Sequence, residues 1–162
     1  MEQVPVEDSA EAKRLDRAAS FVLDEARIIL PGIQVLFGFQ LIAIFNVGFG
    51  RLSPFDQYLH LGSLVLVAIA VALVMTPAAY HRRSKRAHVS GYFVDAASFL
   101  LTLALFFLMI GTAIDAYVVA HVVVENRWLS LAIAIALFLI FAGLWFVYPW
   151  LAHRRKQTHV GS

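Results

Sequence analysis

Long apolar runs, rather than short alternating segments, dominate the pattern of this chain. A hydrocarbon core about 30 Å thick needs about 20 helical residues, because each residue rises about 1.5 Å. Four runs are long enough, and they cover residues 28–49, 58–80, 92–122 and 128–151. An isolated strand would leave its amides unpaired in lipid, so we predict helices. Because the connections are short, the expected fold is an all-α, polytopic membrane protein with a four-transmembrane-helix antiparallel bundle.

The segment before the first run, residues 1–27, is charged and has its own periodic pattern. Its apolar positions recur at helical spacing and form a stripe of Leu15, Ala18, Ala19, Val22, Ala26 and Ile29. This spacing predicts an N-terminal amphipathic helix over residues 10–27 that lies on the membrane surface. Residues 152–162 form a basic tail after the last run.

Composition agrees with the membrane interpretation. Hydrophobic residues make up 60% of the chain and charged residues 15%, whereas soluble domains are about half apolar and about a quarter charged. There is no cysteine, which excludes disulfides, thiolate catalysis and cysteine-based metal sites. The sequence contains no Gly-rich phosphate loop, no HExxH and no nucleophile elbow. We therefore predict that the protein is not an enzyme and carries no cofactor and no metal.

Basic residues alternate between the two sides of the predicted spans. They cluster before the first span, between the second and third, and after the fourth, while the other two loops hold one each, Arg51 and Arg127. Positive charge marks the cytoplasmic side, so we predict a cytoplasmic N-terminus, central loop and C-terminus. These clusters suit anionic lipid rather than nucleic acid. The candidate headgroup ligands are Arg82, Arg83, Lys85, Arg86, Arg154 and Arg155.

Polar residues inside the spans are the candidate functional residues, because they are costly in lipid. Gln34, Gln40 and Asn46 are six residues apart and point in three directions about 120° from one another. Gln40 is the deepest and the best candidate for a buried polar contact between helices. Asp95 and Asp115 bracket an apolar stretch that covers the hydrocarbon thickness. We expect these carboxylates at opposite interfaces, beside an arginine or a backbone partner, with a proton or cation site as the alternative.

His60 and His121 fall at the outer ends of neighbouring spans. A shared metal or an axial haem ligation is geometrically conceivable. Haem ligands in membranes need to lie deep enough to shield the macrocycle, and these two lie at the edge. A membrane redox protein is therefore only the third hypothesis for function.

Two stretches resemble a family of small bacterial four-span membrane proteins of unknown function. They are LDEARIILPGIQVLFGFQL, from Leu23 to Leu41, and TPAAYHR, from Thr76 to Arg82. The resemblance implies the same topology and a location in the bacterial inner (plasma) membrane, and it supplies no activity. Within the first stretch, we expect Pro31-Gly32 to set the angle between the surface helix and the first span.

Two hypotheses of different classes lead. The first is a small homo-oligomeric channel or transport-type protein, because four short spans alone enclose too little space for a wide aqueous path. The second is a non-catalytic structural or accessory membrane protein that binds partner helices or lipids. The first predicts that Gln34, Gln40 or Asn46 faces a water-filled axis, and the second predicts polar contacts buried between helices. Membrane lipids are expected partners in both, and an unidentified membrane partner stays possible.

Overall fold

A computed structural model describes the backbone of residues 6–83 and 91–151, with side chains from residue 11 onward except 12 and 81–83. Four long helices fill these ranges: α1 (Val6–Ile44), α2 (Pro54–Arg83), α3 (Gly91–Val124) and α4 (Arg127–Ala142). A π-helical segment, Gly143–Val147, continues α4, and helix resumes to residue 151. A short 3-10 helix, Phe49–Arg51, lies between α1 and α2. The described ranges contain no strand, as the all-α prediction requires.

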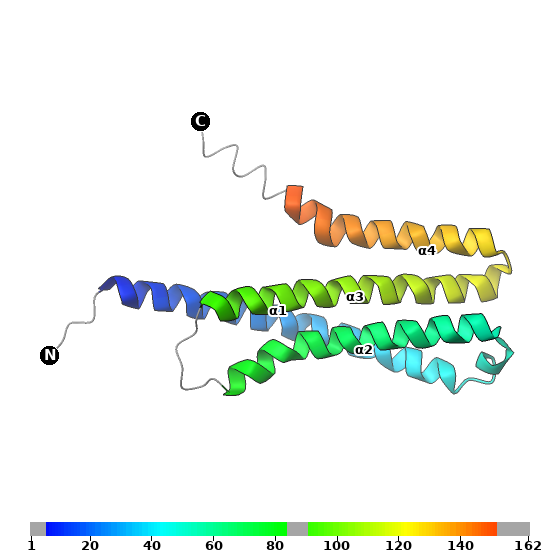
Figure 1. Cartoon of the computed structure of the whole chain (residues 1–162), viewed down its shortest axis with the longest axis horizontal. Coiled ribbons are helices and arrows are strands. Elements are labelled where there is room, and N and C mark those ends of the chain that lie inside the picture. The colour runs from blue at the N-terminus through cyan, green and yellow to red at the C-terminus, as the bar shows by residue number, and fades with distance from the viewer. Residues whose placement is uncertain (1–5, 84–90, 152–162) are drawn as a thin grey trace.

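The helices run up and down beside one another (Figure 1). α2 packs against α1 and α3, α1 also contacts α3, and α4 packs against α3. The α1–α2 connection and the α3–α4 connection lie at the same end of the bundle. This end is called the loop end below. Within the part of the chain that the structure describes, four helices are long and apolar enough to cross a membrane: Lys13–Ile44, Pro54–Tyr80, Gly91–Val124 and Arg127–Leu151. The protein is accordingly assigned as a multi-pass membrane protein.

The first helix differs from its prediction. The expected boundary between a surface helix in residues 1–27 and a span in residues 28–49 is absent, because α1 is continuous from Val6 to Ile44 and includes Pro31. A helix tolerates proline in lipid when neighbouring helices support its backbone. Here Ala19 packs beside Phe93 and Ala97 of α3, in a small cluster of buried residues. The apolar stripe of the N-terminal segment therefore packs against protein and extends α1 in the same direction.

Buried residues follow seven-residue spacings on three helices. On α1 they are Ala19, Ala26, Ile33 and Gln40. On α2 they are Asp56, His60, Ser63, Val67, Ala70, Val74 and Pro77. On α3 they include Phe93, Ala97, Leu101, Ala104, Leu108, Gly111 and Val118. A repeat of 3.5 residues keeps one face toward the partner helices, as in coiled coils. These stripes are apolar along most of their length and polar near the loop end.

α4 is the least enclosed helix. Only Ser130 and Ala134 are buried on Arg127–Ala142, and large side chains such as Trp128, Leu139 and Leu144 are exposed. Near the loop end, an apolar groove of about 680 Å³ lies along α3 and α4 and is lined by residues that include Leu59, Ile110, Tyr117, Trp128, Leu131 and Phe138. Exposed apolar faces of this kind are what a helix presents to lipid tails or to another membrane helix.

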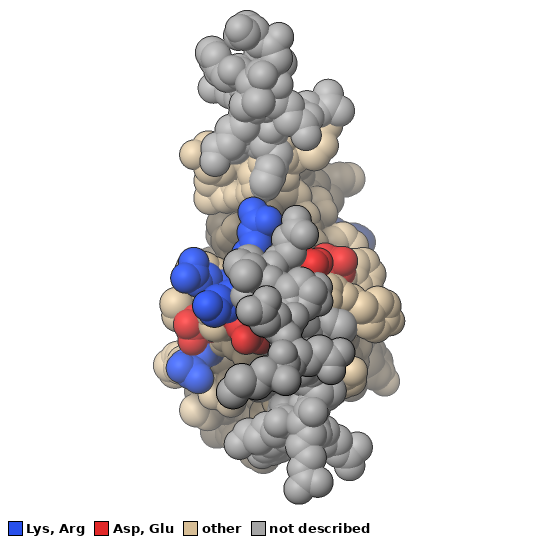
Figure 2. All heavy atoms as spheres, turned by 90° about the vertical axis from the view of Figure 1, so that its left-hand side faces the viewer, with Lys and Arg blue, Asp and Glu red and all other residues tan. Residues whose placement is uncertain are grey.

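Charged side chains gather at the end of the bundle opposite the loop end (Figure 2). The described and exposed basic residues on the N-terminal part of α1 are Lys13, Arg14, Arg17 and Arg27. The predicted headgroup ligands cannot be placed: the side chains of Arg82 and Arg83, and the whole of Lys85, Arg86, Arg154 and Arg155, lie outside the described residues.

Candidate functional site

The first turn of α2 places an acidic residue inside the bundle. Ser53 precedes Pro54, the first residue of the helix, and its Oγ accepts a hydrogen bond from the Asp56 N–H at 3.1 Å. The Ser53 hydroxyl also donates to Asp56 Oδ2 at 2.7 Å. Serine at the cap and proline at the first helical position are favoured at helix starts. The sequence Ser-Pro-Phe-Asp therefore fixes both the beginning of α2 and the direction of the carboxylate.

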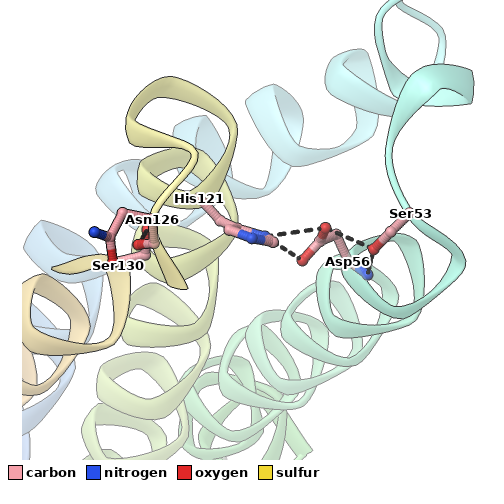
Figure 3. Close-up of polar contacts among 5 residues, drawn as sticks. All are labelled: Ser53, Asp56, His121, Asn126 and Ser130. Carbon is pink, nitrogen blue, oxygen red and sulfur yellow. Dashed lines mark hydrogen bonds and ion pairs between the residues drawn. The ribbon is translucent and has the colours of Figure 1, made fainter. Parts of the chain in front are cut away.

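Asp56 meets His121, which lies in the last turn of α3 (Figure 3). His121 Nδ1 is 3.1 Å from Asp56 Oδ1 and 3.2 Å from Oδ2. The Asp56 side chain is 5% exposed and that of His121 is 31% exposed. Tyr117, one turn earlier on α3, stacks on the imidazole with ring centroids 5.6 Å apart. This pair ties the beginning of α2 to the end of α3.

A second polar cluster lies one to two turns deeper and joins three helices. Gln40 of α1 donates from Nε2 to Ser63 Oγ of α2 at 2.7 Å and also contacts Asp115 Oδ2 of α3. His60 of α2 lies between the other helices, with Nδ1 3.0 Å from Asp115 Oδ1 and Nε2 3.0 Å from the main-chain oxygen of Gln40. Gln40, His60 and Ser63 are all buried. We call Gln40, His60, Ser63 and Asp115 the inner cluster.

The other polar candidates on the spans lie apart from these clusters. Gln34 is exposed on α1, and Asn46 is exposed in the turn that follows it, where its Oδ1 accepts a hydrogen bond from the Gly48 N–H. Asp95 is exposed near the beginning of α3. In the single chain, therefore, Gln34, Gln40 and Asn46 line no common axis, as their spacing indicates.

Asp115 has different partners from those expected. We expected an arginine or a backbone partner, whereas its side chain is 16% exposed and pairs with His60 and Gln40. The physical reason is that α3 buries the same face from Phe93 onward, and Asp115 follows Gly111 by four residues on that face. A residue on that face meets the neighbouring helices rather than lipid headgroups.

His60 and His121 do not share a ligand site. His60 pairs with Asp115 and His121 pairs with Asp56, so each imidazole uses Nδ1 for a different carboxylate. Among the described residues, no group of three or more His, Cys, Asp or Glu side chains is placed to hold a metal ion. The geometry thus gives no support to a metal shared by His60 and His121.

Sequence reasoning missed Ser53, Asp56 and Ser63. The signal that could have identified them is their spacing: Asp56, His60 and Ser63 continue the buried face of Val67, Ala70 and Val74 toward the loop end. The Ser-Pro-Phe-Asp pattern is a second signal, because Ser followed three residues later by an acidic residue is typical of a helix cap.

Buried imidazole–carboxylate pairs have two chemical capacities. They join helices through strong hydrogen bonds, since bonds to charged partners are about twice as strong as neutral ones. They can also hold a proton between the ring nitrogen and the carboxylate, because imidazole can both donate and accept one. Both capacities are concentrated at the loop end.

Comparison with known proteins places the chain in a family without adding an activity. No curated protein and no solved structure matches it. Residues 8–149 match the model of the family described as "Family of unknown function (DUF6328)". That range contains the four membrane helices almost entirely and both polar clusters. The chain therefore belongs to DUF6328, a family of unknown function, as its resemblance to an uncharacterised membrane family predicted.

Proposed function

We propose that this protein is a small, non-enzymatic, homo-oligomeric channel or transport-type protein of the bacterial inner membrane. The observation that carries the proposal is the set of titratable side chains inside its spans: Asp56, His60, Asp115 and His121. Such residues are rare in membrane helices, and they usually mark ion pathways, proton relays or ligand sites. The basic clusters favour an orientation in which the loop end faces outward.

The arrangement favours gated or stepwise movement over an open pore. Among the residues whose side chains are described, buried polar groups of the three-helix interface lie near the loop end, and below them the same faces are apolar, with Val67, Ala70 and Ala104 showing no exposed surface. An ion that enters from the loop end meets this packed half next. Passage therefore requires a rearrangement of the helices or a path between subunits.

The exposed side of α1 supports assembly into oligomers. Gln34 is exposed on this helix, between the exposed residues Gly32 and Val35. It lies ten residues before the last residue of α1, which is about 15 Å along the helix and near mid-membrane. The described residues provide no hydrogen-bond partner for the Gln34 amide, and an unpaired amide in hydrocarbon is unfavourable, so a second copy or water in a path between copies would satisfy it. The exposed apolar faces beside it suit membrane lipids.

Flux measurements on proteoliposomes test the proposal. The protein is reconstituted and the movement of protons and potassium is followed with fluorescent dyes, beside empty liposomes. Gln40→Leu should change the flux measurably, because it removes the amide that joins α1 to Ser63 of α2 and Asp115 of α3. The matched control is Thr102→Val, which removes an exposed hydroxyl that bonds only within α3, to the Ser98 carbonyl. Absence of flux, or equal flux in Gln40→Leu and wild type, would contradict the proposal.

A second candidate is a non-catalytic accessory protein that binds partner helices or lipids. The observation that favours it is that the Gln40 amide contacts Ser63 and Asp115 within one chain, as expected of polar residues that hold helices together. For this function, Gln40→Leu should lower thermal stability in detergent while wild-type liposomes show no flux. A partner that co-purifies with the wild-type protein would separate the two candidates further.

A further inference from the structure

Both ring nitrogens of His60 face atoms that can only accept a hydrogen bond or that carry negative charge. Nε2 lies 3.0 Å from the main-chain oxygen of Gln40, and a carbonyl oxygen is an acceptor only. The hydrogen must therefore be on Nε2. A neutral imidazole has one N–H, so Nδ1 would then present a lone pair to Asp115 Oδ1, which is 3.0 Å away.

A hydrogen bond between Nδ1 and Asp115 Oδ1 requires one more proton. It can lie on Nδ1, which gives an imidazolium beside a carboxylate, or on Oδ1, which gives a neutral imidazole beside a carboxylic acid. The net charge of the pair is zero in both cases, and without the proton it is negative. The two side chains are only 9% and 16% exposed, where an uncompensated charge is unfavourable.

We propose that His60 and Asp115 form a proton-binding site that holds one exchangeable proton between imidazole and carboxylate. Release of this proton leaves two lone pairs facing each other, so the contact between α2 and α3 opens at that point. The ligand is a proton delivered from water at the loop end. The site binds its proton whether or not the protein conducts ions, so a failed flux assay leaves this inference standing.

The Asp56–His121 pair provides a contrast within the same molecule. His121 contacts Asp56 through Nδ1, and a neutral imidazole with its hydrogen on Nδ1 satisfies this contact. Asp56 also accepts a hydrogen bond from the Ser53 hydroxyl and lies in the first turn of α2, where the helix dipole stabilises negative charge. The Asp56–His121 pair therefore does not require the additional proton that the His60–Asp115 geometry demands.

The titratable and charged groups around the inner cluster leave His60 and Asp115 as the pair that shares the proton. The α1 residue in the cluster, Gln40, is uncharged. Asp56 of α2 and His121 of α3 lie nearer the loop end and are paired with each other. α4 begins with Arg127, which is exposed. Among the described residues, the buried Gln40 Oε1 has no hydrogen-bond partner, whereas Nε2 faces Ser63 and Asp115.

Nitrogen NMR of the full chain in liposomes of phosphatidylethanolamine and phosphatidylglycerol tests the site. With histidine labelled with ¹⁵N, the His60 signals should show a protonated Nε2 and an Nδ1 that shares a proton at neutral pH. The shared proton should be lost in one step as the pH rises. Infrared spectra of the same samples tell whether it lies on Asp115, through the carboxylic acid carbonyl band.

Asp115→Asn is the decisive variant. Its amide nitrogen can donate to Nδ1 and its oxygen can accept from Gln40, so the contacts persist without the additional proton. We expect His60 to become a neutral imidazole with its hydrogen on Nε2 and to stop titrating with the pair. Asp56→Asn is the matched control, and it should alter the His121 signals only.

Two results would overturn the proposal. One is a wild-type His60 whose Nδ1 is unprotonated and unshared at neutral pH beside an ionised Asp115, which decides the question even if the variants fail to fold. The other is an Asp115→Asn protein in which His60 titrates as it does in wild type.

Discussion

Gly111 and Ser63 mark a close approach of α3 and α2. Both are buried on the facing stripes of α3 and α2, and Ser63 has no exposed surface. A Cβ at position 111 would lie 3.1 Å from Val67 Cγ2 and 3.3 Å from the main-chain oxygen of Ser63. The second contact is with a backbone atom, which cannot move away by a change of side-chain rotamer. The same close approach brings Ser63 and Asp115 to the amide of Gln40, so a glycine without chemistry of its own controls the geometry of the inner cluster.

Gly111→Ala should therefore destabilise the protein by about 1–3 kcal/mol, the usual cost of overpacking a closely packed interface. Gly62→Ala is the control, because its Cβ would meet nothing within 4 Å. That change should be neutral or stabilise α2 by up to about 1 kcal/mol through helix propensity. The free energy of unfolding in mixed micelles measures both. Equal stability of the two variants would contradict the close approach of α2 and α3.

At the scale of elements, the tight turn between α3 and α4 is defined by two adjacent residues. Glu125 has a positive φ of 54°, a conformation that favours glycine. Asn126 caps α4, and its Oδ1 accepts hydrogen bonds from the N–H groups of Trp128 at 3.0 Å and Leu129 at 3.2 Å. The Ser130 hydroxyl adds a bond to the Asn126 main-chain oxygen at 2.9 Å. Together they reverse the chain and direct α4 back along α3.

Asn126→Ala should lower the stability of the α3–α4 hairpin by about 1 kcal/mol, the typical loss when a helix cap is removed. Glu125→Gly, at the adjacent position, should have the opposite or no effect, because glycine adopts the left-handed region without steric cost. Hydrogen exchange of the amides of Trp128 and Leu129 reports the change locally. Unchanged protection in Asn126→Ala would show that the cap does not hold this turn.

The sequence allowed the elements to be predicted better than their contacts. The bounds predicted for the second to fourth spans lie within those of the observed helices, because span length and hydropathy follow from the thickness of the bilayer. α1 continues through residue 28 without the expected change of helix, and the stripe containing Ala19 and Ala26 suits a membrane surface and an α3 partner equally well. Gln40, His60, Asp115 and His121 were each identified as polar residues. Their pairing depends on the register between helices, which hydropathy does not contain.

At the scale of the whole molecule, the two ends of the bundle differ in chemistry. The loop end contains paired acids and histidines under cover of the helices, and the opposite end carries exposed basic residues on α1. α1, α2 and α3 pack against one another, whereas α4 is held mainly by α3. This asymmetry suits a protein that is fixed in one orientation and has its polar site near one membrane face.

Single cysteines should report that orientation without background, because the chain has no cysteine of its own. Gly50→Cys lies in the exposed 3-10 helix at the loop end, and Glu11→Cys lies on the exposed N-terminal part of α1. A membrane-impermeant maleimide added to intact spheroplasts should label position 50, and position 11 only after lysis. The reverse pattern would invert the predicted orientation, and labelling of neither after lysis would place both sites inside the bilayer.

The polar pairs also have a consequence for biosynthesis. Three of them join the first half of the chain to the second: Asp56 to His121, His60 to Asp115, and Gln40 to Asp115. Synthesis proceeds from the N-terminus, so α1 and α2 enter the bilayer before the partners of Asp56 and His60 exist. Unpaired titratable groups are costly in lipid, and the first hairpin reaches its final packing only when α3 arrives. A chain that stops after α2 thus lacks the α3 partners of Asp56 and His60, and keeps only their contacts to Ser53 and to the Gln40 main-chain oxygen.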